Sequence, residues 1–423
     1  MKNLVILGAG TAGTMMANRM RRRLSRDWAL AVVDPSPVHL YQPGLLFLPF
    51  GARDEAAMQR PRGRTLRSGV TWVRRAVEEV NTSRREVRLE GGDALPYDWL
   101  VVASGSRLRP ELTPGLDESL GRGAAHTFYS LQGAQALREA LARFEGGRLV
   151  LNVVEMPIKC PVAPLEFLFL ADNFFRRRGI REKVELVYAT PLDAAFTRPL
   201  AARLLGRLLE EKGVRLEPDF AAAEVDADHR LLKSYDEREV PFDLLVSIPT
   251  HSGAAFVESS GLGNELGFIP TDKATLQAKE HPEVFVLGDA TDLPASKAGS
   301  VAHFEAEVLE ENLVRALRDE PLAPGFDGHA NCFVESGEGK ALLIDFNYDV
   351  EPLPGRYPLR AMGPFSLMRE SRTNHLGKLA FRWLYWNVLL PGLPVPFVSP
   401  RMSMAGKTTA PPEILKGDEY ADA

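Results

Sequence analysis

The chain has very little cysteine for its length. It has 2 cysteines, Cys160 and Cys332, in 423 residues. Two thiols cannot build a framework of disulfides, and no Cys-x-x-Cys or Cys/His spacing accompanies them, so we expect no metal site. Each thiol is either a small buried apolar residue or a reactive group, and its neighbours in the sequence must decide between these alternatives.

The chain also lacks a large excess of charge of one sign and has no apolar run long enough to span a membrane. The formal net charge is only −5, which gives no reason to expect nucleic-acid binding. After Arg382 the apolar run to Val398 has 398 − 382 = 16 residues and contains three prolines. A membrane-spanning helix needs about 20 residues, so we expect none here. The first residues run directly into a strand pattern, and we expect no export signal.

A glycine-rich turn follows the first predicted strand, residues 3–7. The turn reads Gly8-Ala9-Gly10-Thr11-Ala12-Gly13, and a helix over 14–24 and a strand over 29–33 follow it. In this pattern the first glycine permits a tight turn, the second lets a pyrophosphate approach the backbone, and the third lets the helix pack closely. The acid Asp34 lies 34 − 13 = 21 residues after the last glycine, where it suits a ribose hydroxyl. The sequence predicts a dinucleotide site, and a purely structural glycine turn is the alternative.

An apolar loop over residues 39–51 follows Asp34 and Pro35. Prolines and glycines keep it irregular, and it contains three aromatic residues. An apolar loop at a surface is costly unless it covers something flat and apolar. A flavin ring would suit this loop, and an ordinary packed connection is the alternative.

Two later strands end in residues that suit the same cofactor. The strand over 99–102 ends in small residues, and the strand over 283–287 ends in Gly-Asp. A helix begins near Lys297, so its dipole and the ammonium would favour an anionic reduced flavin. We therefore predict FAD contacts at Gly8, Ala9, Gly10, Thr11, Ala12, Gly13, Asp34, Pro35, Gln42, Pro43, Ala103, Ser104, Gly105, Gly288, Asp289, Lys297 and Ala298.

A second α/β unit lacks the second glycine motif that a nicotinamide site would need. After a strand over 148–154 the chain reads Glu155-Met156-Pro157-Ile158-Lys159-Cys160-Pro161, and a helix over 165–178 follows. A thiol therefore stands where NADH phosphates would bind. The helix N-terminus and Lys159 predict a lowered pKa and a reactive thiol for Cys160. We propose Glu166, in the first turns of this helix, as a proton carrier, and the alternative is an acid on the helix surface.

The C-terminal region is locally basic and aromatic. Between residues 356 and 407 only Glu370 is acidic, against eight basic residues: Arg356, Arg360, Arg369, Arg372, Lys378, Arg382, Arg401 and Lys407. Each basic residue beside an anionic lipid surface contributes about 1 kcal/mol. We predict an interfacial helix over 374–390 with a proline loop behind it, including Phe397, and the alternative is packing on the core or a partner subunit. The aromatic residues Phe333 and Phe365 are predicted quinone contacts, and residues 407–423 a flexible tail.

These motifs are similar to the FAD signatures of flavoproteins with two dinucleotide-binding domains. Within that group the chain resembles the sulfide:quinone oxidoreductases over residues 1 to about 406. The resemblance is carried by His39-Leu40-Tyr41-Gln42-Pro43-Gly44, Lys159-Cys160, Glu166, Asp327-Gly328-His329-Ala330-Asn331-Cys332 and Gly377-Lys378-Leu379-Ala380-Phe381. Many members carry a third cysteine before the second domain, whereas residues 110–159 here contain none. The resemblance therefore implies a variant with two cysteines.

The resemblance implies an α/β fold with two Rossmann-like, three-layer domains and a C-terminal membrane-associating segment. Residues 1–110 and 251–325 would form the FAD domain, 111–250 the second domain with Cys160, and 326–406 the region of the second redox cysteine, the quinone and the membrane contact. The cysteines, 332 − 160 = 172 residues apart, would form a redox pair. Sulfide would attack their bridge, and the Cys332 thiolate would pass two electrons to FAD and then to quinone.

The product would be sulfane sulfur or polysulfide, and the protein would be monotopic on a bacterial or archaeal cytoplasmic membrane. The membrane face, the quinone and the formation of homo-oligomers are left open. Three alternatives remain: the flavoprotein subunit of a flavocytochrome c sulfide dehydrogenase, a type II NADH:quinone oxidoreductase, and a catalytically silent FAD-binding scaffold.

Overall fold

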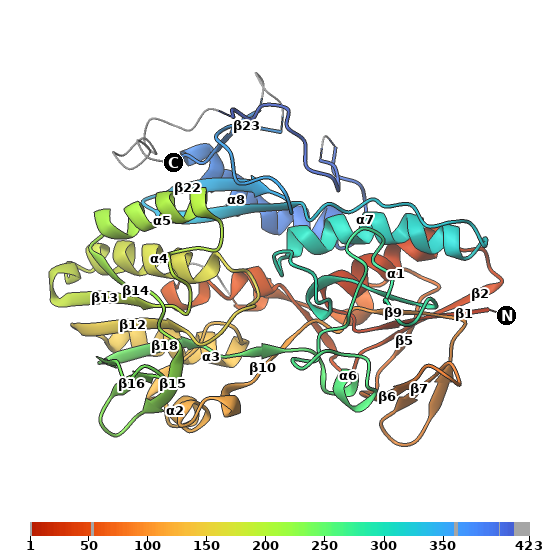
Figure 1. Cartoon of the computed structure of the whole chain (residues 1–423), viewed down its shortest axis with the longest axis horizontal. Coiled ribbons are helices and arrows are strands. Elements are labelled where there is room, and N and C mark those ends of the chain that lie inside the picture. The colour runs from red at the N-terminus through yellow and green to blue at the C-terminus, as the bar shows by residue number, and fades with distance from the viewer. Residues whose placement is uncertain (1, 52–54, 359–362, 397, 410–423) are drawn as a thin grey trace.

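The computed structural model describes residues 2–51, 55–358, 363–396 and 398–409. Figure 1 shows two α/β units side by side, with the C-terminal region lying along one side of both. The expected fold class, with two units built on parallel sheets, is confirmed. Among the described residues, no helix combines the length and the hydrophobicity that crossing a lipid bilayer requires.

The first unit is built on a five-stranded parallel sheet in the order β20-β9-β1-β2-β5. Its strands are short apolar runs, as expected for a sheet buried on both faces. The helices α1 and α7 lie next to one another over this sheet (Figure 1). The bounds are β1 Lys2–Leu7, α1 Thr11–Arg23, β2 Trp28–Val33, β3 Val38–Leu40, β4 Gln59–Pro61, β5 Thr71–Val73, β9 Trp99–Val102, α6 Ala255–Ser259, β20 Val284–Val286 and α7 Gly299–Ala316.

A small antiparallel sheet of three strands is attached to the first unit: β6 (Val77–Asn81), β7 (Glu86–Leu89) and β8 (Ala94–Pro96). The apolar run over residues 70–77 does not form one continuous strand. The chain turns between β5 and β6, at the exposed Arg74 and Arg75, and these charged side chains stay in solvent.

The second unit repeats the first, with a five-stranded parallel sheet in the order β11-β18-β12-β13-β14. It also carries a three-stranded antiparallel sheet, β15-β16-β17. The chain passes between the units through the paired β10 and β19. The bounds are β10 Arg107–Leu108, α2 Leu116–Arg122, β11 Ala125–His126, α3 Leu131–Arg143, β12 Gly147–Val153, α4 Ala163–Arg177, β13 Val184–Ala189, α5 Pro199–Glu211, β14 Val214–Glu217, β15 Ala222–Asp226, β16 Leu231–Ser234, β17 Glu239–Pro241, β18 Leu244–Ile248 and β19 His251–Ser252.

The C-terminal region forms a four-stranded sheet in the order β21-β22-β24-β23, covered by α8. The sequence predicts one helix over 374–390, but the α-helical pattern ends at Leu384 and a π-helical turn follows. Such turns need one extra residue per hydrogen-bonded loop and occur often at functional sites. The bounds are β21 Ala330–Gly337, β22 Lys340–Phe346, β23 Gly355–Tyr357, β24 Phe365–Leu367, α8 Arg372–Leu384 and the π-turn Tyr385–Leu389.

Residues 398–409 return along the C-terminal sheet. The Arg356 amide donates to the Gly406 carbonyl at 2.9 Å, and the Thr408 amide donates to the Pro354 carbonyl at 2.8 Å. The predicted flexible tail is therefore wrong in its first residues, because the Lys407 side chain is only 1% exposed and pairs with a buried aspartate. Residues 410–423 of that predicted tail lie outside the described part of the chain.

Candidate functional site

The two units and the C-terminal region enclose one cavity of about 420 Å³. Most of the predicted site residues line it, although they come from five separate stretches of the chain. Ala9, Gly13, Pro35, Cys332, Phe333 and Phe365 are not part of its wall. The predicted residues that line it are Gly8, Gly10, Thr11, Ala12, Asp34, Gln42, Pro43, Ala103, Ser104, Gly105, Cys160, Glu166, Gly288, Asp289, Lys297 and Ala298.

The three glycines of the first turn do different things. A methyl group on Gly8 would overlap the carbonyl of Ala103, and one on Gly13 would overlap the carbonyl of Gly8. A methyl group on Gly10 would meet nothing within 4 Å, because this glycine faces the cavity. The N-terminus of α1 has no side-chain cap and no acid in its first turn, so it is electrostatically suited to an anion such as a pyrophosphate.

Asp34 is fixed at the cavity wall by several donors. Its carboxylate accepts hydrogen bonds from the amides of Ala9 at 2.8 Å and Ser36 at 2.9 Å. It also forms an ion pair with Arg62 at 3.3 Å. Arg62 is buried and lines the cavity too, but nothing in its sequence surroundings distinguishes it from a surface arginine.

The carboxyl end of β20 brings several buried charges together. The Lys297 ammonium donates to the carbonyls of Asp289 at 3.1 Å and Thr291 at 2.7 Å, so protein oxygens already hold it. Glu305, which sequence reasoning missed because it follows no motif, accepts from the Gly288 amide at 2.5 Å. Burial raises the pKa of Glu305 to about 7 and also raises the pKa of Asp289.

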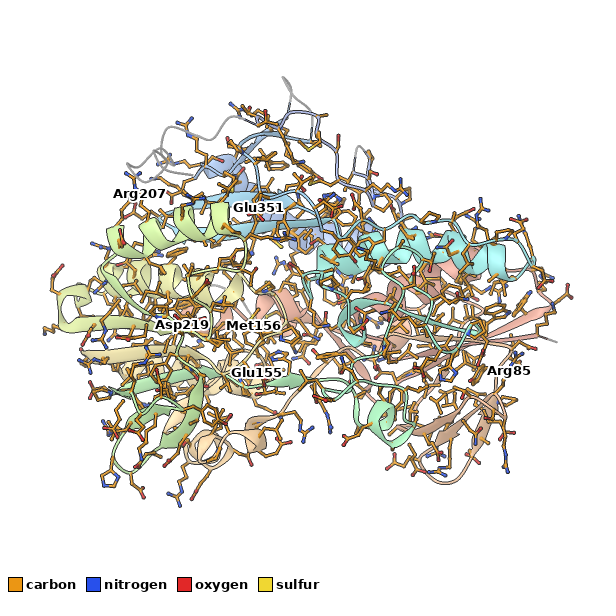
Figure 2. The ribbon with its side chains drawn as sticks, in the orientation of Figure 1. Arg85, Glu155, Met156, Arg207, Asp219 and Glu351 are labelled. Atoms are coloured by element: carbon orange, nitrogen blue, oxygen red, sulfur yellow. The ribbon has the colours of Figure 1, made fainter. Side chains whose placement is uncertain are left out.

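The junction between β12 and α4 holds Cys160 where the two units meet. Glu155 and Met156, labelled in Figure 2, mark the start of this junction near the middle of the molecule. The Cys160 amide donates to the Lys297 carbonyl of the first unit at 2.7 Å, and the Cys160 carbonyl accepts from the first amide of α4 at 2.8 Å. These two backbone hydrogen bonds fix Cys160 at the N-terminus of α4, where it lines the cavity.

The expected low pKa of Cys160 is contradicted. Burial raises the pKa of this thiol well above its ordinary value, the neighbouring Glu166 and Cys332 raise it further, and only Lys378 and a helix amide lower it. Burial also raises the pKa of Cys332 to about 12. The helix dipole is thus outweighed by the loss of water. The cation that acts on the thiol is Lys378 of α8, whereas Lys159 reaches toward the Gln42 side chain at 3.4 Å.

Glu166 is buried, so the alternative interpretation as an acid on the helix surface is wrong. Its side chain is 0% exposed, because β21 and α8 cover the first turns of α4. One carboxylate oxygen accepts from the Lys378 ammonium at 2.6 Å and from the Glu335 amide at 2.8 Å. The other oxygen has no hydrogen-bond partner among the described residues.

Lys378 joins three segments. Besides the carboxylate of Glu166, its ammonium contacts the Phe333 carbonyl at 2.7 Å, beside Cys332. Burial alone would lower the pKa of Lys378, but the nearby Glu166 and Cys160 outweigh it and raise that pKa. Sequence reasoning assigned this lysine to the basic surface, which is wrong because only 16% of its side chain is exposed.

Phe333 and Phe365 do lie together, but beside the cavity. Their ring centroids are 5.2 Å apart at an interplanar angle of 76°, and the backbone of Gly377 packs against both rings. Successive residues of a strand face opposite sides, so Phe333 faces α8 while Cys332 faces the interior.

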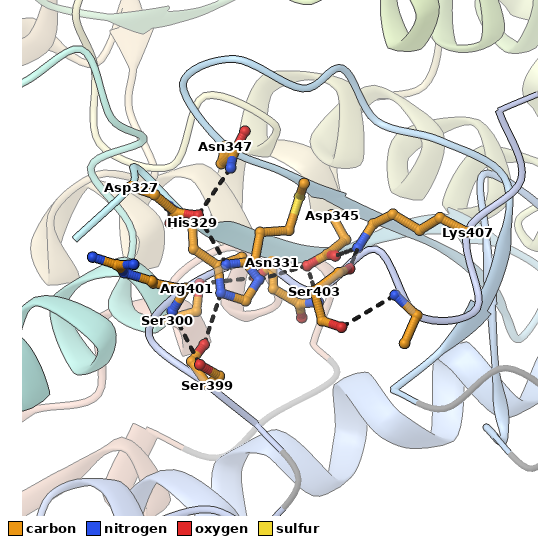
Figure 3. A network of polar contacts seen from close by, with 12 residues as sticks. Ser300, Asp327, His329, Asn331, Asp345, Asn347, Ser399, Arg401, Ser403 and Lys407 are labelled. Atoms are coloured by element: carbon orange, nitrogen blue, oxygen red, sulfur yellow. Dashed lines mark hydrogen bonds and ion pairs between the residues drawn. The ribbon is translucent and has the colours of Figure 1, made fainter. Parts of the chain in front are cut away.

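A network of buried polar groups supports β21, the strand that carries Cys332 (Figure 3). The His329 ring bonds the Asp345 carboxylate at 2.8 Å and the Ser399 carbonyl at 2.9 Å, and Asn331 donates to the same carboxylate at 3.0 Å. Lys407 forms an ion pair with the other oxygen of Asp345. The network fixes the returning segment 398–409 against the cysteine strand and removes a second lysine from the predicted basic surface.

Comparisons with known proteins agree with this geometry. Residues 2–154 match the pyridine nucleotide-disulphide oxidoreductase family, and the match ends shortly before Cys160. A mouse mitochondrial sulfide:quinone oxidoreductase is 28% identical over 396 residues, covering 92% of this chain and 86% of the relative. The Dictyostelium discoideum mitochondrial protein of the same name is 27% identical over 395 residues, with the same coverage of both chains.

A solved structure shows the same fold. The sulfide:quinone oxidoreductase of the hyperthermophilic bacterium Aquifex aeolicus superposes with a TM-score of 0.77 at 19% identity, covering 92% of each chain. The chain is therefore similar to sulfide:quinone oxidoreductases over 92% of its length, which confirms the resemblance that its motifs carry.

Proposed function

We propose that the protein is an FAD-dependent sulfide:quinone oxidoreductase. The observation that carries the proposal is that Cys160, which stands in place of a second nucleotide-binding turn, opens into the same cavity as the glycine-rich turn. Its relatives from mouse and Dictyostelium discoideum are named for this activity and align over nine tenths of the chain. We keep the division into an FAD domain (1–110 and 251–325), a second domain (111–250) and a C-terminal region (326–406).

The residues at the cavity wall fit FAD. The open N-terminus of α1 with Gly10 suits the pyrophosphate, and the fixed carboxylate of Asp34 suits the adenosine ribose. The apolar residues Pro43, Leu45 and Leu46 suit the flavin ring near Cys160. When bound, the flavin would accept two electrons from a thiolate and release them to a quinone.

The chain's own chemistry would take place at Cys160 and Cys332. With the two sulfurs joined, hydrosulfide attacks one of them, the S–S bond breaks, and the products are one persulfide and one thiolate. Two electrons must then leave the pair before a sulfane sulfur or polysulfide is released and the bond re-forms. Cys332 is buried, Cys160 is partly buried at the cavity wall, and the pKa values of both thiols are raised. The nearby ammonium of Lys378 would therefore stabilise the thiolate as it forms.

Glu166 and Lys378 would also handle protons. Glu166 lines the cavity, and among the described residues one of its carboxylate oxygens has no hydrogen-bond partner. This oxygen can receive a proton released by hydrosulfide. The ammonium beside it also holds the Phe333 carbonyl, next to the rings proposed for the quinone. A proton and an electron pair released at the thiols would therefore have a short route to the same face of the protein.

We propose that the quinone reaches Phe333 and Phe365 from a membrane surface. The outer face of α8 exposes Leu376, Leu379 and Trp383 at 62%, 43% and 65%, a pattern suited to an interfacial helix. Four basic residues are exposed or partly exposed and suit lipid headgroups: Arg356, Arg369, Arg372 and Arg382. The guanidinium of Arg401 instead donates to the carbonyls of Pro324 and Gly325. The predicted Arg360 and Phe397 lie outside the described residues. Attachment to a bacterial or archaeal membrane stays a prediction, since the relatives include mitochondrial proteins.

The test mixes the purified protein with sulfide in the absence of oxygen, and then with a short-chain quinone. We expect a bound flavin identified as FAD, loss of its visible absorbance with sulfide, and recovery with quinone. If NADH but not sulfide removes the absorbance, a type II NADH:quinone oxidoreductase is favoured instead. If neither reductant acts, the protein is a silent FAD-binding scaffold.

A further inference from the structure

The C-terminal region reaches the glycine-rich turn through one hydroxyl group. Tyr385, the first residue of the π-turn, is fully buried. Its hydroxyl lies 2.7 Å from the Thr11 hydroxyl and 2.7 Å from the His39 Nε2 atom. Thr11 is the first residue of α1, and all three side chains line the cavity. A residue of the C-terminal region therefore completes the wall at the site that suits a pyrophosphate.

The chain around Tyr385 docks on the same helix. The Asn18 side chain donates to the Leu390 carbonyl at 2.9 Å, and the Arg22 guanidinium donates to the Pro391 carbonyl at 3.1 Å. Trp386 lies under the guanidinium of Arg60, 4.3 Å from the ring centroid. These contacts join residues 385–391 to α1 and its surroundings. The docking of this segment and the shape of the glycine-rich turn (residues 8–13), which we call the phosphate turn, therefore depend on one helix.

The hydroxyls of Thr11 and Tyr385 and the imidazole of His39 form a chain of hydrogen bonds, and the tautomer of His39 sets the direction in which the groups donate. Burial lowers the pKa of His39 to about 3, so the ring is neutral and carries one proton. With that proton on Nε2, His39 donates to Tyr385, Tyr385 donates to Thr11, and the Thr11 proton is free for an anion. In the other tautomer Thr11 must donate to Tyr385. An anion at the N-terminus of α1 favours the first arrangement, because it accepts the freed proton.

We propose that Tyr385 is a positioning residue for the FAD pyrophosphate, acting through Thr11, and that FAD binding and docking of residues 385–391 stabilise each other. The proposal depends on the proposed function only because it takes FAD as the cofactor. It requires neither sulfide nor quinone. Linkage makes the coupling reciprocal, so the factor by which docking tightens FAD binding equals the factor by which FAD tightens docking. Loading of the cofactor would therefore order the segment that follows the outward-facing helix α8.

The first experiment measures FAD affinity. Apo-protein of wild type and of Tyr385→Phe is titrated with FAD, and quenching of flavin fluorescence reports binding. We expect about fivefold to tenfold weaker binding for Tyr385→Phe, the size of one neutral hydrogen bond. Thr11→Val should weaken binding similarly, and the double variant no further, because both act through one chain. The control is Tyr188→Phe, which removes an equally buried hydroxyl from β13 of the second unit and should leave FAD affinity unchanged.

The second experiment measures docking. Amide hydrogen exchange of residues 385–390 is compared with and without FAD. In wild type FAD should slow this exchange, and in Tyr385→Phe the FAD effect should shrink by the same factor as the affinity. The proposal is overturned if Tyr385→Phe and Thr11→Val both bind FAD as tightly as the wild type and the Tyr188→Phe control do. It is also overturned if FAD slows exchange of residues 385–390 equally in the wild type and in all three single variants. A wild-type protein that binds no FAD would overturn the cofactor assignment itself, and this result is visible before any variant is made.

Discussion

The two α/β units share the arrangement of four parallel strands, β9-β1-β2-β5 in the first and β18-β12-β13-β14 in the second, but they differ in the chemistry of their first turn. In each, a central strand is followed by a helix, with β1 and α1 in the first unit and β12 and α4 in the second. The first turn has three glycines, and one of them faces open space. The second has prolines and Cys160 and no glycine. The scaffold supplies a helix N-terminus in both cases, and the turn residues decide whether it receives an anion or presents a thiol.

The first turns of the two helices also differ in charge. Helix α1 has no acid there, whereas α4 has Glu166. A carboxylate at that position repels an anionic ligand, and here it is held by Lys378 from the C-terminal region. Where the first unit has a helix N-terminus without an acid, the second unit therefore has a site with a thiol, an acid and a lysine.

The largest expected effect on the difference between the two turns comes from substitution of Cys160. The substitution Cys160→Ser should lower sulfide-dependent quinone reduction on the order of a thousandfold or more, because the hydroxyl cannot form a persulfide. Its FAD content should stay that of wild type, since the phosphate turn belongs to the other unit. Quinone absorbance and flavin content measure the two effects, and Cys332→Ser is the matched variant. Retained turnover in either variant would contradict the thiol mechanism.

The next largest effect is on the stability of the second unit's site. Lys378→Met leaves the buried Glu166 carboxylate without its cation, and we expect a loss of about 3–5 kcal/mol in the free energy of unfolding. The double variant Lys378→Met with Glu166→Gln should recover most of this loss. Urea unfolding measures both. A double variant no more stable than the single one would show that the ion pair is not the cause.

The glycines of the first turn should separate folding from binding. Gly13→Ala should lower the free energy of unfolding by about 1–3 kcal/mol, because its methyl group overlaps the Gly8 carbonyl. Gly10→Ala should cost less than about 1 kcal/mol in the apo-protein but weaken FAD binding at least about tenfold, since its methyl group enters the cavity. Urea unfolding and FAD titration of both variants check this, and the reverse ranking would contradict the assignment of the cavity.

The last prediction depends on pH and concerns Glu305, whose carboxylate accepts a hydrogen bond from the Gly288 amide and, among the described residues, has no lysine partner of the kind that Glu166 has. Burial raises the pKa of Glu305 from 4.5 to about 7, so the folded state holds this proton more tightly than the unfolded state. The contribution to stability is full below about pH 4.5 and is lost as pH rises through 7, on the order of 3 kcal/mol in all. Urea unfolding of the FAD-free protein between pH 4.5 and 8 should show this fall, and Glu305→Gln should flatten it. Equal slopes for both proteins would rule it out.

Local patterns predicted the parts of the site that depend on neighbouring residues. The glycine turn, Asp34 and the strand ends at Ser104 and Asp289 all line one cavity. The reason is that parallel strands bring their carboxyl ends to one edge, so a spacing along the chain becomes a position in space. The absence of glycine around Cys160 was equally local and equally informative.

Long-range burial is what the local patterns missed. The low pKa expected for Cys160 considered its own helix and Lys159, but the C-terminal region packs on the same helix and desolvation raises the pKa of this thiol. The same covering turned Lys378 from a surface cation into the partner of Glu166 and enclosed Lys407 with Asp345. None of these pairings follows from spacing, because their members are joined only when the C-terminal sheet packs on the two units.

The sequence alone determined the two α/β units, the glycine-rich turn of the first unit and the cysteine at the corresponding turn of the second, since each depends on residues within one strand, turn and helix. Only the tertiary structure decided which charges are buried, which cation faces the thiols, and that Tyr385 touches the phosphate turn. Those outcomes depend on desolvation and on contacts between segments hundreds of residues apart, and such contacts leave no periodic signal in the chain.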